Sequence, residues 1–168
     1  YSSTEGGATT NASLPFRAVS DIYEANNDDQ RYVKWFDSGS FRKYTVENSD
    51  KFFKKIPVIK LSEMYLIVAE AYYSTDPDKA LEYINDLRDH RIRNNVHWEY
   101  ISRDFIVNEM TREFLGEGQL WYAYKRMNRA IPTGSAEGDV QPSNTVFVFP
   151  MPDKEIENGH RNPNTQNQ

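Results

Sequence analysis

Apolar side chains recur with a helical period between residues 56 and 129. The clearest stripe predicts a helix that ends near Ser74, with apolar positions three or four residues apart: Leu61, Met64, Tyr65, Val68, Ala69 and Tyr72. Asp76 and Pro77 then predict a new start, since an aspartate N-cap followed by proline suits the first turn of a helix. This second helix should end near residues 93–95. The short connection favours antiparallel packing of the two helices as a hairpin.

A second helical hairpin is predicted after a loop that contains Trp98 and Tyr100. Ser102 is the expected N-cap of a helix that reaches Gly116, and a shorter helix should follow over residues 119–128. The aromatic residues of the shorter helix are expected to pack in the core or within the hairpin: Trp121, Tyr122 and Tyr124. The hairpins begin about 40 residues apart, in the range of helical repeat units. The small residues and paired tyrosines of residues 69–87 are reminiscent of tetratricopeptide packing.

The flanking segments lack this period. Residues 1–55 are rich in Ser, Asn, Gly and other turn formers, which predicts an irregular, loop-rich cover made of short strands or of a loop laid over the scaffold. After residue 130 the sequence predicts a loop, a short strand over residues 145–149, one last helical turn near residues 153–156 and an extended tail. The expected fold is mainly α, with tetratricopeptide-like antiparallel hairpins, in one region that covers residues 1–168.

Composition excludes several classes of function. The 168 residues carry a formal charge of −5, and their Lys and Arg are scattered, so no nucleic-acid partner is expected. There is no cysteine, and the three histidines are widely spaced, so we expect no metal site. The sequence shows no glycine-rich phosphate loop and no serine elbow, and it predicts no cofactor. The longest apolar run, residues 64–69, is too short to span a bilayer.

Three glutamates recur at every fourth position: Glu109, Glu113 and Glu117. This spacing aligns them on one face of a helix, partly on its apolar side, where a charge must be paired. One interpretation is a pair of carboxylates for glycoside hydrolysis. We favour a structural charge network, in which Glu113 and Glu117 pair with arginines of adjoining helices. The cations available to it are Arg88, Arg91, Arg112, Lys125 and Arg126.

Aromatic residues outside the helical stripes are the candidates for ligand binding: Tyr32, Trp35, Tyr44, Trp98 and Tyr100. A sugar ring stacks on an exposed aromatic ring because the C–H face of the sugar is apolar. The alternative is that these rings pack the loops onto the scaffold, and we favour this alternative for each ring taken singly.

Four stretches follow one another with an order and spacing typical of one family. The first is Asp29-Gln-Arg31-Tyr32, and the second runs from Ile56-Pro57 to Ala69-Glu70-Ala71. The third runs from Ala80 to Arg88 and includes Ile84-Asn85. The fourth is Glu109-x-x-Arg112-Glu113, followed by Glu117-Gly118 and Lys125-Arg126. Phe149-Pro150-Met151-Pro152 closes the series. From about Asp29 onward the chain resembles the C-terminal half of the SusD/RagB family of nutrient-binding lipoproteins of Bacteroidetes. Three residues depart from the family's pattern: Lys60, Met110 and Ala123.

The resemblance implies a helical scaffold whose N-terminal half is not included in this chain. It implies a lipid-anchored protein on the outer surface of the outer membrane. Such a protein binds oligosaccharides or other nutrients and delivers them to a TonB-dependent, SusC-like transporter, without catalysis. The alternative that the residues themselves leave open is a tetratricopeptide-like scaffold for protein–protein contacts.

Overall fold

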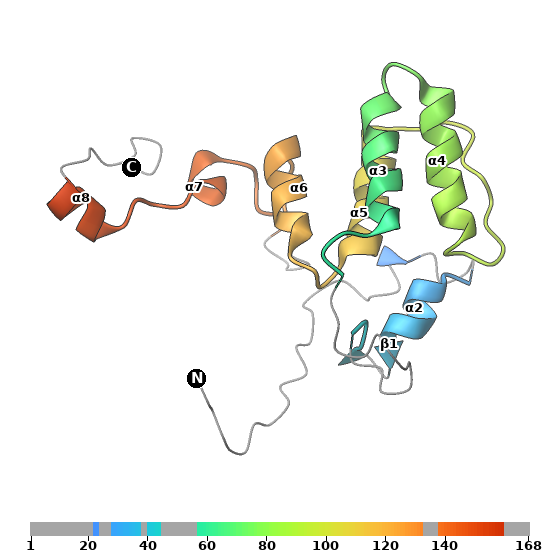
Figure 1. Ribbon diagram of the computed structural model, residues 1–168, viewed down its shortest axis with the longest axis horizontal. Helices are drawn as coiled ribbons and strands as arrows, with labels where there is room; N and C mark the ends of the chain where they lie inside the picture. The colour runs from blue at the N-terminus through green and yellow to red at the C-terminus, as the bar shows by residue number, and fades with distance from the viewer. Residues whose placement is uncertain (1–21, 24–27, 38–39, 45–56, 133–137, 160–168) are drawn as a thin grey trace. The chain divides into compact units, whose positions relative to one another are not determined.

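The computed structural model describes residues 22–23, 28–37, 40–44, 57–132 and 138–159 (Figure 1). The chain divides into two compact units, residues 1–117 and residues 118–168, and each is described by itself. Helices dominate both units, which confirms the predicted mainly α class. Within the described residues, no helix is long and apolar enough to cross a membrane.

The first unit is built around a helical hairpin of α3 (Leu61–Tyr72) and α4 (Pro77–Asp89). As predicted, Asp76 is the N-cap of α4, where its carboxylate accepts a hydrogen bond from the amide of Lys79 at 3.2 Å, and Pro77 occupies the first turn. The helices lie side by side, joined by a short loop (Figure 1). The predicted hairpin is therefore confirmed.

The buried face of α3 differs from the predicted stripe. Ser62, Leu66 and Ala69 are buried, whereas Leu61 is 72 % exposed and Met64 is also exposed. The prediction is wrong for Leu61 and Met64 because apolar residues occupy most of the circumference of this helix. Periodicity alone cannot decide which side faces the neighbouring α4 and α5.

Helix α5 (Arg103–Phe114) packs on α3 and carries two of the three glutamates. Ser102 caps it as predicted, with its hydroxyl accepting a hydrogen bond from the amide of Phe105 at 3.2 Å. The helix ends before Gly116, whose φ of +75° is left-handed. A side chain on Gly116 would overlap the ring of Phe41, so glycine lets this ring lie directly against the backbone.

The N-terminal part of this unit contains α2 (Gln30–Trp35) and two strands, β1 (Phe36–Asp37) and β2 (Ser40–Phe41). The strands pair antiparallel, with Phe36 opposite Phe41. Of the two alternatives, short strands or a loop, the described part of the segment contains short strands, whereas α2 is a helix that the sequence pattern does not predict. Most of the predicted irregular cover, residues 1–21 and 45–56, lies outside the described residues.

The second unit contains α6 (Gln119–Met127), α7 (Asn144–Phe147) and α8 (Asp153–Gly159). Helix α6 and the last helical turn confirm their predictions. Since α5 and α6 belong to different units, their pairing as a second hairpin stays a prediction.

Two predictions for the second unit are wrong. The predicted strand over residues 145–149 is instead the turn α7, because the hydroxyl of Ser143 accepts a hydrogen bond from the amide of Val146 at 3.3 Å and starts a helix there. Tyr122, expected to pack in the core or within the hairpin, is 71 % exposed. Tyr124 is buried, and Trp121 packs edge-on against Phe147 with ring centroids 5.4 Å apart.

Candidate functional site

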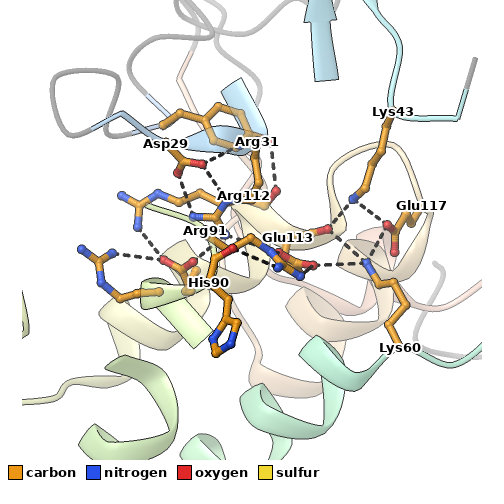
Figure 2. A network of polar contacts seen from close by, with 12 residues as sticks. Asp29, Arg31, Lys43, Lys60, His90, Arg91, Arg112, Glu113 and Glu117 are labelled. Atoms are coloured by element: carbon orange, nitrogen blue, oxygen red, sulfur yellow. Dashed lines mark hydrogen bonds and ion pairs between the residues drawn. The ribbon is translucent and has the colours of Figure 1, made fainter. Parts of the chain in front are cut away.

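A cluster of charged side chains lies where α2, α5 and the end of α4 meet (Figure 2). At its centre Glu109 is 0 % exposed. Its Oε1 accepts a hydrogen bond from Arg31 at 2.5 Å, and its Oε2 accepts from Arg112 at 2.9 Å and from Arg88 at 3.3 Å. We call this part of the cluster the arginine end; it consists of Asp29, Arg31, Arg88, Glu109 and Arg112. One buried carboxylate therefore meets three guanidinium groups.

The first turn of α2 delivers Arg31 to this site. Asp29, the N-cap of α2, accepts a hydrogen bond from the backbone amide of Arg31 at 2.9 Å. The same carboxylate holds the guanidinium with two bonds, from Nε at 3.0 Å and from Nη2 at 2.8 Å. This bidentate pair fixes the fork of Arg31, so that its remaining Nη1 points at Glu109.

Glu113 lies one helical turn further along α5 and joins the two ends of the cluster. Arg91, just beyond α4, binds both of its carboxylate oxygens at 3.0 Å. Arg31 reaches Glu113 at 3.4 Å and Lys60 reaches it at 3.8 Å. Glu113 therefore ties α5 to α2, to the end of α4 and to the residue that precedes α3.

The other end of the cluster is built on lysine, and we call it the lysine end: Lys43, Tyr44, Lys60 and Glu117. Oε1 of Glu117 accepts from Lys43 at 2.6 Å, from Lys60 at 2.7 Å and from the hydroxyl of Tyr44. Both lysines also donate to the carbonyl of Glu113, near the C-terminal end of α5, where positive charge is favoured by the helix dipole. The ammonium of Lys43 lies 3.7 Å from the ring centroid of Trp35.

The pKa values of the cluster follow from burial and from these partners. Burial raises the pKa of Glu109, but the guanidiniums of Arg31, Arg112 and Arg88 outweigh it and lower the pKa to about 2. Glu113 and Glu117 also have lowered pKa values, because their cationic partners outweigh burial in the same way. Burial lowers the pKa of Lys43 to about 8, and the nearby charge of Lys60 adds to this effect against the attraction of Glu117.

This arrangement holds helices together and does not suit acid–base chemistry. A general acid must hold a proton near neutral pH, and the lowered pKa values keep all three glutamates ionised there. The described residues contain no group of three acidic, histidine or cysteine side chains placed to hold a metal ion. The cluster therefore acts on packing, through charges that are paired and hydrogen-bonded in a dry site.

Residues 5–167 match the model of the SusD family. The chain belongs to the SusD family. Three solved structures are similar to it. A protein of Bacteroides vulgatus, provisionally named a sugar binding protein, is 20 % identical, with a TM-score of 0.70. A SusD superfamily protein of Bacteroides thetaiotaomicron is 25 % identical, with a TM-score of 0.64, and another of B. vulgatus is 23 % identical, with a TM-score of 0.66.

The matches cover 89 %, 86 % and 87 % of this chain, in the same order, but only 38 %, 39 % and 37 % of the solved chains. This SusD-family chain thus spans less than half the length of the structures it resembles. No match was found among curated proteins.

The structure brings together most of the predicted charge network of this SusD-family chain, namely Arg88, Glu109, Arg112, Glu113 and Glu117. The expectation that Glu117 pairs with arginines is wrong, because two lysines and a tyrosine surround its carboxylate. Arg126 lies on α6 in the second unit, so its part in the network stays a prediction.

Four charged members of the cluster are missing from the predicted network: Asp29, Arg31, Lys43 and Lys60. They lie far from α5 in sequence, and Arg31 is 78 residues from Glu109. The Asp29-x-Arg31 motif was a usable signal, because an acidic residue two positions before an arginine at a helix start supplies a local partner. Nothing in the spacing of the sequence points to Lys43.

Three of the predicted ligand-binding aromatics lie around α2 and the lysine end. The ring of Tyr32 lies 6.2 Å from that of Tyr23 and 6.0 Å from that of Phe36. Trp35 has Lys43 over its ring, and Tyr44 donates its hydroxyl to Glu117. These contacts are those of side chains that pack the N-terminal elements onto α5.

The remaining two, Trp98 and Tyr100, lie in the loop between α4 and α5. The guanidinium of Arg88 lies 4.1 Å from the ring centroid of Trp98. Phe105 contacts both aromatics, with centroids 4.7 Å from Trp98 and 5.1 Å from Tyr100. Tyr100 is 68 % exposed. The structure therefore separates the five candidates into two groups on different elements.

Proposed function

We propose that this chain is part of a non-catalytic protein that binds glycans at the cell surface and delivers oligosaccharides to a TonB-dependent outer-membrane transporter. Membership of the SusD family supports glycan binding, as does the name of the similar sugar binding protein. One observation supports the proposal that the protein is not catalytic. Each of the three glutamates, Glu109, Glu113 and Glu117, forms ion pairs inside the scaffold.

The described region supplies the rigid part of this protein. The cluster connects α2, the end of α4 and α5 through buried ion pairs, and breaking a buried pair is costly. A rigid scaffold of this kind can hold loop residues in place, and binding residues are often found on loops positioned by a scaffold. We place ligand contact on such loops and exclude the cluster from it.

Titration calorimetry with a panel of oligosaccharides tests glycan binding on the protein as the cell makes it. At least one glycan should bind and be recovered unchanged after prolonged incubation. Turnover of a glycan that disappears in a folded Glu113→Gln variant would contradict the non-catalytic role. Absence of binding across the panel would contradict the glycan ligand.

Delivery to a transporter and the location of the protein need separate tests. We expect the protein to fractionate with the outer membrane, to be accessible to protease added to whole cells, and to carry a lipid. An affinity tag should recover a TonB-dependent barrel from detergent-solubilised membranes. Recovery of the protein without any barrel, in the presence of its glycan, would contradict delivery.

A tetratricopeptide-like scaffold for protein contacts is the second candidate, and one observation favours it. Three exposed apolar side chains follow one another along α3 at intervals of three residues: Leu61, Met64 and Ile67. Contiguous exposed apolar surface is typical of protein interfaces. A Leu61→Asp and Ile67→Asp double variant would lose a protein partner under this function, while glycan affinity should not change.

A further inference from the structure

A row of side chains in contact leads outward from the buried charge cluster to the loop between α4 and α5, and its aromatic rings are tilted against one another. Glu109 binds Arg88, and the guanidinium of Arg88 lies over the ring of Trp98. Phe105 then contacts Trp98 on one side and Tyr100 on the other. The row begins at a residue with no exposed surface and ends at Tyr100, which is 68 % exposed.

The backbone of this loop is held at Trp98. The amide of Trp98 donates to Oδ1 of Asn85 at 2.9 Å, and its carbonyl accepts from Nδ2 of the same asparagine at 3.0 Å. Asn85 is a buried residue of α4, so one side chain fixes both polar groups of the loop residue. The loop is also tied to Asp89, which accepts hydrogen bonds from Asn95 at 2.7 Å and from His97 at 2.9 Å.

We infer that Tyr100, supported by Phe105 and Trp98, is a stacking platform for a neutral pyranose ring. This assignment rests on the proposed function and names the ligand contact within it. A single exposed tyrosine is ordinary on a protein surface. Tyr100 differs because its support is already ordered, so that binding costs little additional conformational entropy.

Geometry favours Tyr100 over the other candidates. A pyranose presents an apolar C–H face, which needs an open aromatic face of similar size. Trp35 is covered by an ammonium group, and the hydroxyl of Tyr44 is already bound to Glu117. Trp98 lies between Arg88 and Phe105, which makes it a positioning residue for the platform.

The charges around the platform favour a neutral sugar over an acidic one. Glu99, Arg103 and Asp104 are exposed residues close to Tyr100 in the sequence, and they sum to one negative charge. The guanidinium of Arg103 lies 5.2 Å from the ring centroid of Tyr73. A uronate would be repelled by the two carboxylates unless the arginine compensated for both. Hydroxyl groups of a neutral sugar can accept hydrogen bonds from the arginine and donate to the carboxylates.

The test compares variants of Tyr100 by calorimetry against neutral glucan, mannan and xylan oligosaccharides and against oligogalacturonates. Tyr100→Ala should weaken binding of a neutral glycan by at least about tenfold. Tyr100→Leu, which keeps apolar bulk without a ring, should lose binding similarly, whereas Tyr100→Phe should remain within about threefold of wild type. Tyr122→Ala, matched in residue type and exposure, and Val96→Ala, exposed on the same loop, should not change affinity.

The outcomes separate this assignment from the proposed function. If wild type binds a neutral glycan and folded Tyr100→Ala or Tyr100→Leu binds it equally well, the platform is overturned while glycan binding stands. Preference for oligogalacturonates, or equal loss in Tyr100→Phe, would also overturn the assignment. If no glycan binds wild type at millimolar concentration, the proposed function itself is contradicted, and the platform with it.

Discussion

Each end of the buried cluster is built around a glutamate, but the cations that surround the glutamate differ between the two ends. At the arginine end, Glu109 has no exposed surface, and three guanidinium groups surround its carboxylate. At the lysine end, Glu117 receives two ammonium groups and a tyrosine hydroxyl on a single oxygen. The other oxygen, Oε2, is buried without a hydrogen-bond partner among the described residues.

Because of this difference, the cations of the arginine end keep their charge as pH changes, whereas a cation of the lysine end can titrate. Arginine stays charged and presents a planar fork, so the arginine end keeps its geometry at any ordinary pH. Lysine changes its pKa readily when buried, and Lys43 has a pKa lowered to about 8. The lysine end should therefore be the weaker and more adjustable part of the cluster.

The largest effect is expected at the arginine end. Glu109→Ala leaves three guanidiniums buried without their common partner, and it should lower the free energy of unfolding by about 3–5 kcal/mol. Chemical denaturation measures this change. Glu82→Ala, on the exposed face of α4, is the control and should stay within about 0.5 kcal/mol of wild type. A similar small change for Glu109→Ala would show that the arginine end does not support the fold.

The next effect concerns the turn that leads into the lysine end. Gly116→Ala places a methyl group against the ring of Phe41 at a left-handed φ, and should cost roughly 2–4 kcal/mol. Gly118→Ala is a matched control, because Gly118 has nearly the same φ but open space around it. It should cost only about 1–2 kcal/mol. Equal costs at the two glycines would mean that the contact with Phe41 contributes nothing.

A smaller effect is expected for Glu117→Gln at the lysine end. The amide keeps the shape of the carboxylate but removes its negative charge, so that both lysines lose their ion pair and keep only hydrogen bonds to a neutral oxygen, at a cost of about 1–2 kcal/mol. Chemical denaturation in parallel with Glu109→Gln would compare the ends directly. A larger loss for Glu117→Gln than for Glu109→Gln would reverse the ranking proposed here.

The smallest effect is a pH dependence that belongs to Lys43. Its folded pKa of about 8 lies below the ordinary value of 10.5, so between these values the unfolded chain binds more protons than the folded one. The free energy of unfolding should therefore rise with pH in this window, by about 1 kcal/mol between pH 8 and pH 9. The rise should be absent from Lys43→Met and kept in Lys34→Met, an exposed control. Identical pH profiles for wild type and Lys43→Met would refute a buried ammonium with a lowered pKa.

The sequence predicts α3, α4, α5 and α6 well because their signals are local, whereas it does not predict α2. Asp76 with Pro77, and Ser102, form the predicted caps. Glu109 and Glu113 fall on α5 as expected, whereas Glu117 lies beyond the end of this helix. The buried face of α3 is the exception, since apolar residues surround most of that helix. The strand predicted after Ser143 is wrong for a related reason: the β-branched residues favoured a strand, but one capping hydroxyl decided the local structure.

The site is predicted only in part because its partners are distant in sequence. The need of Glu109 and Glu113 for cations follows from their position on an apolar face, but periodicity does not identify which cations meet them. Arg31 and Lys43 reach α5 from segments more than 60 residues away. A local pattern does not indicate such distant contacts. The Asp29-x-Arg31 motif, which resembles a motif of the family, did indicate that Arg31 has an acidic partner.

The distance between Arg31 and Glu109 along the chain also has a consequence for synthesis. At ribosomal rates of about 5–20 residues per second, Glu109 is made on the order of 4–16 s after Arg31. During this interval Arg31 can form its ion pair with Asp29, but the acidic residues of α5 are not yet present to pair with it. Burial of the α2 turn therefore cannot be complete until Glu109 has been made, when α3 and α4 are already part of the chain.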